Sequence, residues 1–104
     1  MAQFDVYENQ NTVTSPSIPY LLDVQVDFLD TLGTRVVIPL IRAASFGKTA
    51  KHLNPQFVIG QDIVIMSTAE LAGVSVRLLG NKVCSLKGQR DEIVAALDFL
   101  FTGF

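Results

Sequence analysis

The sequence is short of charge. Of its 104 residues, 17% are charged, with 10 acidic and 8 basic side chains, and 49% are hydrophobic. Charged residues usually make up about 25% of a globular chain. The small net charge of −2 excludes the strong basic excess typical of nucleic-acid-binding domains, and the high hydrophobic share excludes an acidic disordered chain. Because few charges cover so small a domain, we expect part of its apolar surface to face a partner, most simply a second copy of the chain.

Cysteine and histidine occur once each, and tryptophan is absent. The single cysteine, Cys84, excludes an internal disulfide, and its apolar neighbours favour a buried or half-buried thiol. His52 is the only histidine that could activate that thiol, and nothing in the sequence places the two together. One cysteine and one histidine cannot complete a structural zinc site, and the common phosphate-binding and serine-hydrolase motifs are missing. We therefore expect no catalytic residue, no metal and no cofactor.

Long apolar runs are absent too. The longest candidates, residues 36–41 and 63–66, are strand-sized, far below the ~18 residues that span a bilayer. The first residues show neither the basic start nor the apolar stretch of a secretion signal. We expect a cytoplasmic protein without membrane contact, forming one domain over residues 1–104.

Alternation of apolar and polar residues predicts antiparallel strands. The clearest example is 20–28, where the even-numbered residues from Leu22 to Phe28 are apolar and the odd-numbered residues from Asp23 to Asp27 are polar. This pattern predicts one buried and one solvated face. Asp23, Asp27 and the nearby Asp30 could hold Mg²⁺, but a solvated strand face is the favoured interpretation. Further strands are predicted at residues 3–7, 35–41, 56–59, 63–67, 74–79 and 82–84.

The end of the chain is predicted to be helical from Gln89 to Phe101. Its apolar stripe repeats with helical spacing, its first turn is acidic, and Gly103 supplies a left-handed stop. A second apolar flank on the helix suggests two apolar neighbours. Strands followed by one helix predict a mostly β (α+β) domain, either barrel-like or a sandwich.

A loose basic group lies in the irregular segment between the third and fourth predicted strands. It comprises Arg42, Lys48, Lys51 and His52. It could contact phosphates or an acidic peptide, although an ordinary solvated loop is the favoured interpretation.

Several blocks of the sequence resemble the CcdB family in order and spacing over nearly the whole chain. They are Gln3-Phe4-x-Val6-Tyr7, Asp23-Val24-Gln25-x-Asp27, Asp30-Thr31-x-Gly33-x-Arg35-x-Val37-Ile38-Pro39-Leu40, and a helix that ends in Gly103 followed by an apolar residue. The resemblance implies a homodimer with an SH3-like β-barrel of antiparallel strands and a C-terminal α-helix. It also implies a toxin of a type II toxin–antitoxin module without enzymatic activity of its own. Such toxins bind the A subunit of DNA gyrase and trap its cleaved-DNA intermediate. A cognate CcdA-like antitoxin releases gyrase, represses the operon together with the toxin, and makes the DNA contacts.

The same resemblance places the gyrase-binding residues in the first strand, just before the turn near residue 30, and at the end of the helix. The matched positions are Gln3, Phe4, Tyr7, Phe28, Leu29, Thr102, Gly103 and Phe104, together with Val26 and Asp98, which stand where the family has Ser and Asn. Thr102 replaces a family Trp that stacks on an Arg of gyrase, so Phe101 or Phe104 is expected to supply the aromatic ring. Arg42, Lys48 and Lys51 are expected to contact the antitoxin, by location.

Two alternatives remain. One is an endoribonuclease toxin of the same fold, for which Arg35, Arg42, Lys51 and His52 are the available groups, without a recognisable arrangement. The other is a CcdB-like protein that has lost toxicity through Thr102 and only binds the antitoxin.

Overall fold

The computed structural model describes residues 1–29 and 31–103, which form seven strands, four short 3₁₀ helices and one α-helix. The strands are β1 (Asp5–Asn9), β2 (Tyr20–Asp23), β3 (Thr34–Arg42), β4 (Gln56–Ile59), β5 (Asp62–Met66), β6 (Ala72–Ser75) and β7 (Leu79–Ser85). The 3₁₀ helices are η1 (Asp27–Leu29), η2 (Thr68–Glu70), η3 (Val76–Leu78) and η4 (Lys87–Gln89), and the α-helix is α1 (Arg90–Thr102).

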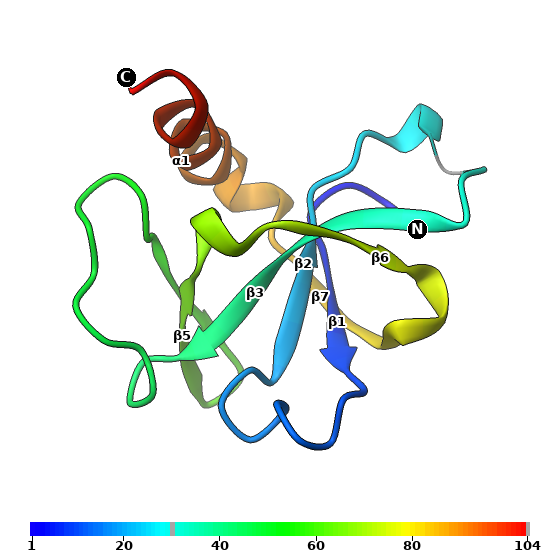
Figure 1. Cartoon of the computed structure of the whole chain (residues 1–104), viewed down its shortest axis with the longest axis horizontal. Coiled ribbons are helices and arrows are strands. Elements are labelled where there is room, and N and C mark those ends of the chain that lie inside the picture. Colours follow the sequence, from blue (N-terminus) through cyan, green and yellow to red (C-terminus); the bar gives the residue numbers. More distant parts are fainter. Residues whose placement is uncertain (30, 104) are drawn as a thin grey trace.

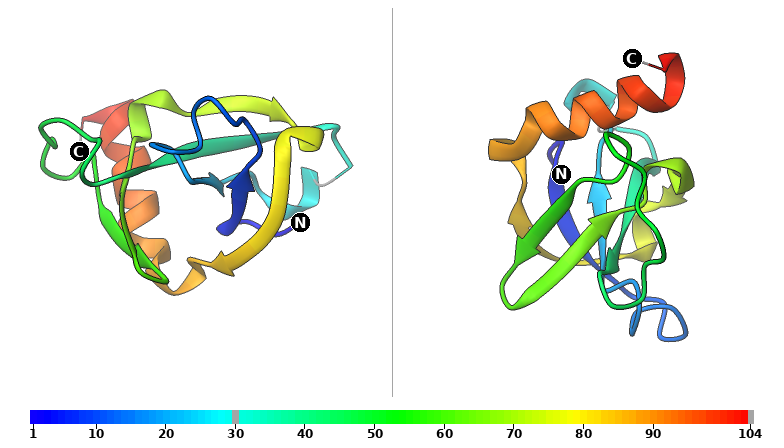
Figure 2. Two further views of the ribbon diagram at one scale, coloured as in Figure 1. Left: turned by 90° about the horizontal axis from the view of Figure 1, so that it is seen from below. Right: turned by 90° about the vertical axis from the view of Figure 1, so that its left-hand side faces the viewer.

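The strands pair antiparallel throughout, in the order β4-β5-β3-β2-β1-β7. The short strand β6 lies outside this order and pairs with the first half of β3. The long strand β3 crosses the middle of the molecule, and the sheet curls around it into a half-barrel (Figure 1). Helix α1 lies across one end of this barrel, and the loop after β1 lies at the opposite end (Figure 2, right). The predicted α+β, SH3-like architecture is confirmed.

The strand β3 holds this curl together because it has two partners on one side. Its first half pairs with β6, from Thr34↔Ser75 to Val37↔Ala72, and its second half pairs with β5 from Leu40 onward. Pro39 falls in the gap between these partners, where a missing N–H costs no ladder hydrogen bond. The carbonyl of Pro39 accepts from Ser67 N at 3.0 Å.

The main core fills one face of the sheet under α1. It consists of the buried apolar residues Phe4, Val6, Leu22, Ile38, Leu40, Phe57, Ile59, Val64, Met66, Leu86, Ile93 and Ala96. Neighbours along the same strands point to the other face, as strand geometry requires. There Tyr7, Val37 and Leu79 form a smaller cluster, with Leu21 and Val74 packed against it.

The predicted strand over residues 20–28 is wrong beyond Asp23, and its predicted faces hold only in part: Leu22 is buried as expected, but several later residues depart from the pattern. Strand β2 ends at Asp23, and the 3₁₀ helix η1 follows. Asp23 and Gln25, predicted to be solvated, are 0% and 7% exposed, whereas Phe28, predicted to be buried, is 82% exposed. This departure is possible because the polar side chains find buried hydrogen-bonding partners, as described below.

Three smaller predictions also need correction. The first strand begins at Asp5 rather than at Gln3. Gly80 and Asn81, which separate the strands predicted at 74–79 and 82–84, lie inside β7. Glycine is needed at position 80 because a Cβ there would meet Glu8 Cβ and the Glu8 carbonyl oxygen at 3.0 Å. Phe101, placed in the buried helix stripe, is 70% exposed, whereas Ile93 and Ala96 are buried. The helix stop is confirmed, since Gly103 has a left-handed φ of 78°.

Candidate functional site

An apolar ridge follows β2 on the surface. Its exposed side chains belong to Val26, Phe28, Leu29 and Leu32, and we call this group the η1 ridge. Tight turns bring them together: Leu29 N donates to the Val26 carbonyl at 3.2 Å, and Leu32 N donates to the Leu29 carbonyl at 3.1 Å. Exposed aromatic and aliphatic side chains of this kind are typical anchors of protein recognition.

A buried ion pair lies beneath the ridge. Arg35 at the start of β3 and Asp23 at the end of β2 are both 0% exposed. Arg35 Nε and Nη2 donate to the same oxygen, Asp23 Oδ2, at 2.8 and 2.7 Å. Burial raises the pKa of the Asp23 carboxyl, and the hydrogen bonds from Arg35 and from the Gln25 backbone oppose this effect. Two charges are stable in such a place only when they are paired and hydrogen-bonded.

The N-terminal residues hold the ridge from a second side. Gln3 N donates to Asp27 Oδ1 at 2.6 Å, and Gln3 Nε2 donates to the Val24 carbonyl at 3.1 Å. The carboxylate of Asp27 therefore accepts a hydrogen bond from the Gln3 backbone, and the carboxylate of Asp23 is paired with Arg35. Asp30, the third carboxylate considered for a cation, lies outside the described residues. Among the residues that the structure describes, no group of three or more His, Cys, Asp or Glu side chains could hold a metal ion.

Two of the predicted gyrase-binding residues point into the protein. Phe4 is 3% exposed and has a left-handed φ of 73°, and its backbone joins β2 to the segment before α1 through hydrogen bonds with Asp23 and Leu86. Tyr7 is buried, and its hydroxyl donates to Asp5 Oδ2 at 3.3 Å. Burial, followed by the charge of Asp5, raises the pKa of Tyr7 to about 12. Neither side chain offers much surface to a partner in this chain, and their contact with gyrase stays a prediction.

The end of α1 carries the other predicted residues on its surface. Asp98, Thr102 and Gly103 are exposed, and Thr102 Oγ1 donates to the Asp98 carbonyl at 2.6 Å. Phe101 beside them is the exposed aromatic of this end, while Phe104 lies outside the described residues. Helix η1 (cyan) and α1 (red) lie at the same end of the barrel (Figure 2, right), but η1 and the end of α1 are apart along the long axis of the molecule (Figure 1). In one chain the two predicted parts are therefore separate surface features.

The basic group is divided. Arg42 donates to the Pro16 carbonyl at 2.9 Å and forms an ion pair with Asp62. The hydroxyl of Tyr20 also donates to Asp62, at 2.7 Å. Hydrogen bonds from Tyr20 and Arg42 lower the pKa of the Asp62 carboxyl. The remaining members, Lys48, Lys51 and His52, are exposed on the loop between β3 and β4, where the His52 ring lies 6.0 Å from the Phe99 ring.

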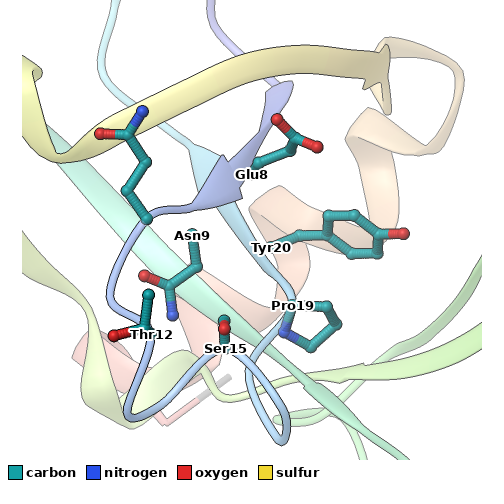
Figure 3. A pocket seen from close by; sticks show the side chains of 7 residues that line it. Glu8, Asn9, Thr12, Ser15, Pro19 and Tyr20 are labelled. Atoms are coloured by element: carbon teal, nitrogen blue, oxygen red, sulfur yellow. The ribbon is translucent and has the colours of Figure 1, made fainter.

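A polar hollow lies between the ends of β1 and β2 and the loop that joins them (Figure 3). Its lining comprises Glu8, Asn9, Gln10, Thr12, Ser15, Pro19 and Tyr20. Asn9 Nδ2 ties the loop together by donating to Thr14 Oγ1 at 3.0 Å and to the Ile18 carbonyl at 2.9 Å. Glu8, the one carboxylate in this lining, accepts from Asn81 N at 3.3 Å. The lining thus lacks the paired acid and base that proton-transfer catalysis requires.

The single thiol, Cys84, is half-buried, as predicted, and burial raises its pKa. In the described part of the chain, no helix is long and apolar enough to cross a bilayer.

The described surface thus carries an apolar ridge at η1 and an exposed phenylalanine at the end of α1. The family model described as CcdB protein matches residues 3–103. The match begins at Gln3, which holds the η1 ridge, and ends at Gly103, which caps α1. The chain belongs to the CcdB family, the toxins of toxin–antitoxin systems.

Proposed function

We propose that this toxin binds the A subunit of DNA gyrase, traps the cleaved-DNA intermediate and so blocks the topoisomerase. The proposal rests on one observation in addition to the family. Two exposed phenylalanines, Phe28 at 82% and Phe101 at 70%, stand in the two surface segments that the resemblance assigns to gyrase. A solvated phenylalanine gains stabilisation only when a partner covers it. The toxin acts by this contact and not by chemistry of its own.

The aromatic contact at the helix end falls to Phe101. Thr102 stands where the family has Trp, and its hydroxyl is already occupied by the Asp98 carbonyl. Losing a buried aromatic anchor typically costs ~2 kcal/mol or more of binding free energy. Phe101, one residue earlier and exposed, supplies the replacement ring. A Phe101→Ala toxin with unchanged gyrase affinity would contradict this assignment.

We expect the toxin to act as a homodimer. In one chain η1 and the end of α1 lie at the same end of the barrel but apart along its long axis (Figure 1), and a second copy would enlarge the contact area that they offer. The low charge and high apolar content also support self-association. Light scattering after size-exclusion chromatography at micromolar concentration should give twice the mass of 11.4 kDa, and a strict monomer would exclude the composite surface.

The antitoxin is expected to use a different chemistry. Lys48 and Lys51 are exposed cations on the loop between β3 and β4, whereas Arg42 is held by Asp62. An acidic antitoxin segment would be attracted to the two lysines, and contact with operator DNA would be made by the antitoxin. The affinity of the Lys48→Ala/Lys51→Ala toxin for its antitoxin should fall, and the salt dependence of binding should weaken.

The deciding experiment adds purified toxin to gyrase supercoiling and cleavage reactions, and separately to bulk RNA. Accumulation of cleaved DNA–gyrase complexes supports the proposal. RNA fragments would favour the endoribonuclease alternative, and inactivity in both assays with intact antitoxin binding would favour a non-toxic homologue.

A matched pair of variants makes the result specific. Phe28→Ala should reduce gyrase poisoning at least tenfold, the effect of losing one anchor. Val13→Ala is the control, because Val13 is 87% exposed but lies in the loop at the other end of the barrel (Figure 2, right). Equal losses in both variants would show that η1 is not the contact.

A further inference from the structure

The conformation of the η1 ridge is not stabilised by contacts within η1 itself. Helix η1 is three residues long, and none of them is buried. A single 3₁₀ turn has few hydrogen bonds and poor geometry, and its apolar side chains face solvent, so packing adds little. The order of Phe28 and Leu29 must come from groups outside η1.

One buried side chain supplies much of that order. Gln25 is 7% exposed, and both ends of its amide are used. Gln25 Nε2 donates to the Leu29 carbonyl at 3.1 Å, and Gln25 Oε1 accepts from Val36 N at 3.1 Å. The amide therefore connects the last residue of η1 to the central strand β3.

The backbone of Gln25 is fixed by the buried ion pair. Gln25 N donates to Asp23 Oδ1 at 3.0 Å, and the Gln25 carbonyl accepts from Arg35 Nη2 at 3.2 Å. Because Arg35 also holds the other oxygen of Asp23, the two charges, the glutamine and the end of η1 form one connected network. Networks of this kind, when every member is satisfied, fix a unique local geometry.

We propose that Gln25 is a positioning residue for partner binding: from the interior it sets the η1 ridge in the shape that gyrase recognises, without touching gyrase. This inference rests on the proposed function. It assigns a role in recognition to a residue outside the predicted contact set. The gain is pre-organisation, since a ridge that is ordered before binding loses less entropy when the partner covers it.

Two substitutions at this position separate the hydrogen bonds from the volume. Gln25→Met keeps a side chain of similar length and removes both hydrogen bonds. Gln25→Glu keeps an acceptor for Val36 N but loses the donor to the Leu29 carbonyl. Gln56→Met is the matched control, because Gln56 is exposed on β4.

The test measures gyrase affinity, antitoxin affinity and amide hydrogen exchange on the full-length toxin. Gln25→Met should weaken gyrase binding about tenfold, because of the two lost hydrogen bonds the one to the Leu29 carbonyl holds the ridge, and it should leave antitoxin binding unchanged. Exchange of the Leu29 amide, which reports the turn with Val26, should accelerate by a similar factor. Gln25→Glu, which keeps the acceptor for Val36 N, should show the same losses of gyrase affinity and of protection at Leu29, and Gln56→Met should show none.

A double-mutant cycle with Phe28→Ala distinguishes positioning from general damage. If Gln25 acts through the ridge, Gln25→Met should have little further effect on gyrase affinity once Phe28 is alanine. Additive losses would overturn the inference, and so would an unchanged affinity despite faster exchange at Leu29. A wild-type toxin that fails to bind gyrase would instead overturn the proposed function, and the inference with it.

Discussion

The two ends of strand β3 each carry an arginine paired with an aspartate, and the two pairs differ in burial. Near the start of the strand, Arg35 and Asp23 are both 0% exposed. At its end, the side chains of Arg42 and Asp62 are 39% and 28% exposed. Both pairs join an arginine of the same strand to an aspartate, and they differ in how far solvent reaches them. Comparing them therefore shows the effect of solvent on an ion pair.

The comparison indicates that burial turns an ion pair from a minor contact into a structural requirement. An exposed pair contributes little because water screens the charges and solvates each of them when the pair opens. A buried pair has no such substitute, so removing one partner leaves an uncompensated charge in the interior. In this toxin the buried pair also holds Gln25 and, through it, the η1 ridge. The exposed pair connects β3 with β5 and with the loop at Pro16.

The largest effect is expected at the buried end. Arg35→Met should lower the free energy of unfolding by about 3–5 kcal/mol, because the Asp23 carboxylate then lies buried without its partner. A domain of this kind has a free energy of unfolding of roughly 5–15 kcal/mol, so this loss is a large share of the total. Urea titration followed by circular dichroism measures the change. A loss below ~1 kcal/mol would mean that solvent reaches Asp23 and would remove the contrast between the two ends.

Removing both charges of the buried pair separates its effect on the stability of the fold from its effect on the position of the η1 ridge. Asp23→Leu in the Arg35→Met background removes both charges and should recover most of the lost stability, because a buried pair is often replaceable by packed apolar residues. Hydrogen exchange at the Leu29 amide should stay fast, since the Gln25 backbone has lost both polar partners. Recovery of slow exchange together with stability would show that the ridge does not depend on this network.

Much of the fold could be predicted because its signals are local. The strands predicted at 35–41, 56–59 and 63–67 and the glycine stop at Gly103 each depend on a few neighbouring residues. Local chemistry sets these features, and the structure confirms them.

The candidate site was harder to predict because its polar residues depend on partners distant in sequence. The alternation around Asp23 suggests a solvated face, and only the arrival of Arg35 from the next strand makes its burial possible. In the same way, Gly80 looked like a turn residue, whereas its constraint is the close approach of Glu8 across the sheet. The family resemblance placed Phe28 at a surface contact, in agreement with its exposure, although alternation alone predicted it to be buried. Phe4 and Tyr7 came from the same resemblance, yet both are buried in the chain.

At the exposed end of β3 a much smaller effect is expected. Arg42→Met should lower the free energy of unfolding by no more than ~1 kcal/mol, because water takes over the solvation of Asp62. The same urea titration used for Arg35→Met gives a direct comparison within one strand. The two losses should differ at least threefold. Equal losses would show that the hydrogen bond from Arg42 to the Pro16 carbonyl, rather than burial, determines the cost.

The smallest effect is the response of the exposed pair to acid. The hydrogen bonds from Tyr20 and Arg42 hold the pKa of Asp62 below its ordinary value of 3.8. A carboxyl with a lowered pKa in the folded state contributes stability above its unfolded pKa and loses it as the pH falls through the folded pKa. Wild-type toxin should therefore lose stability relative to Asp62→Asn as the pH falls below about 4, and the difference should shrink at high salt because this pair is exposed. The raised pKa of buried Asp23 has the opposite sign: its contribution is present at low pH and declines as the pH rises through the folded value. If the free energy of unfolding depends on pH in the same way for Asp62→Asn and for the wild type, the contact between Arg42 and Asp62 does not persist in solution. In that case β3 has an ion pair only at its buried end, and burial would not be the difference between its two ends.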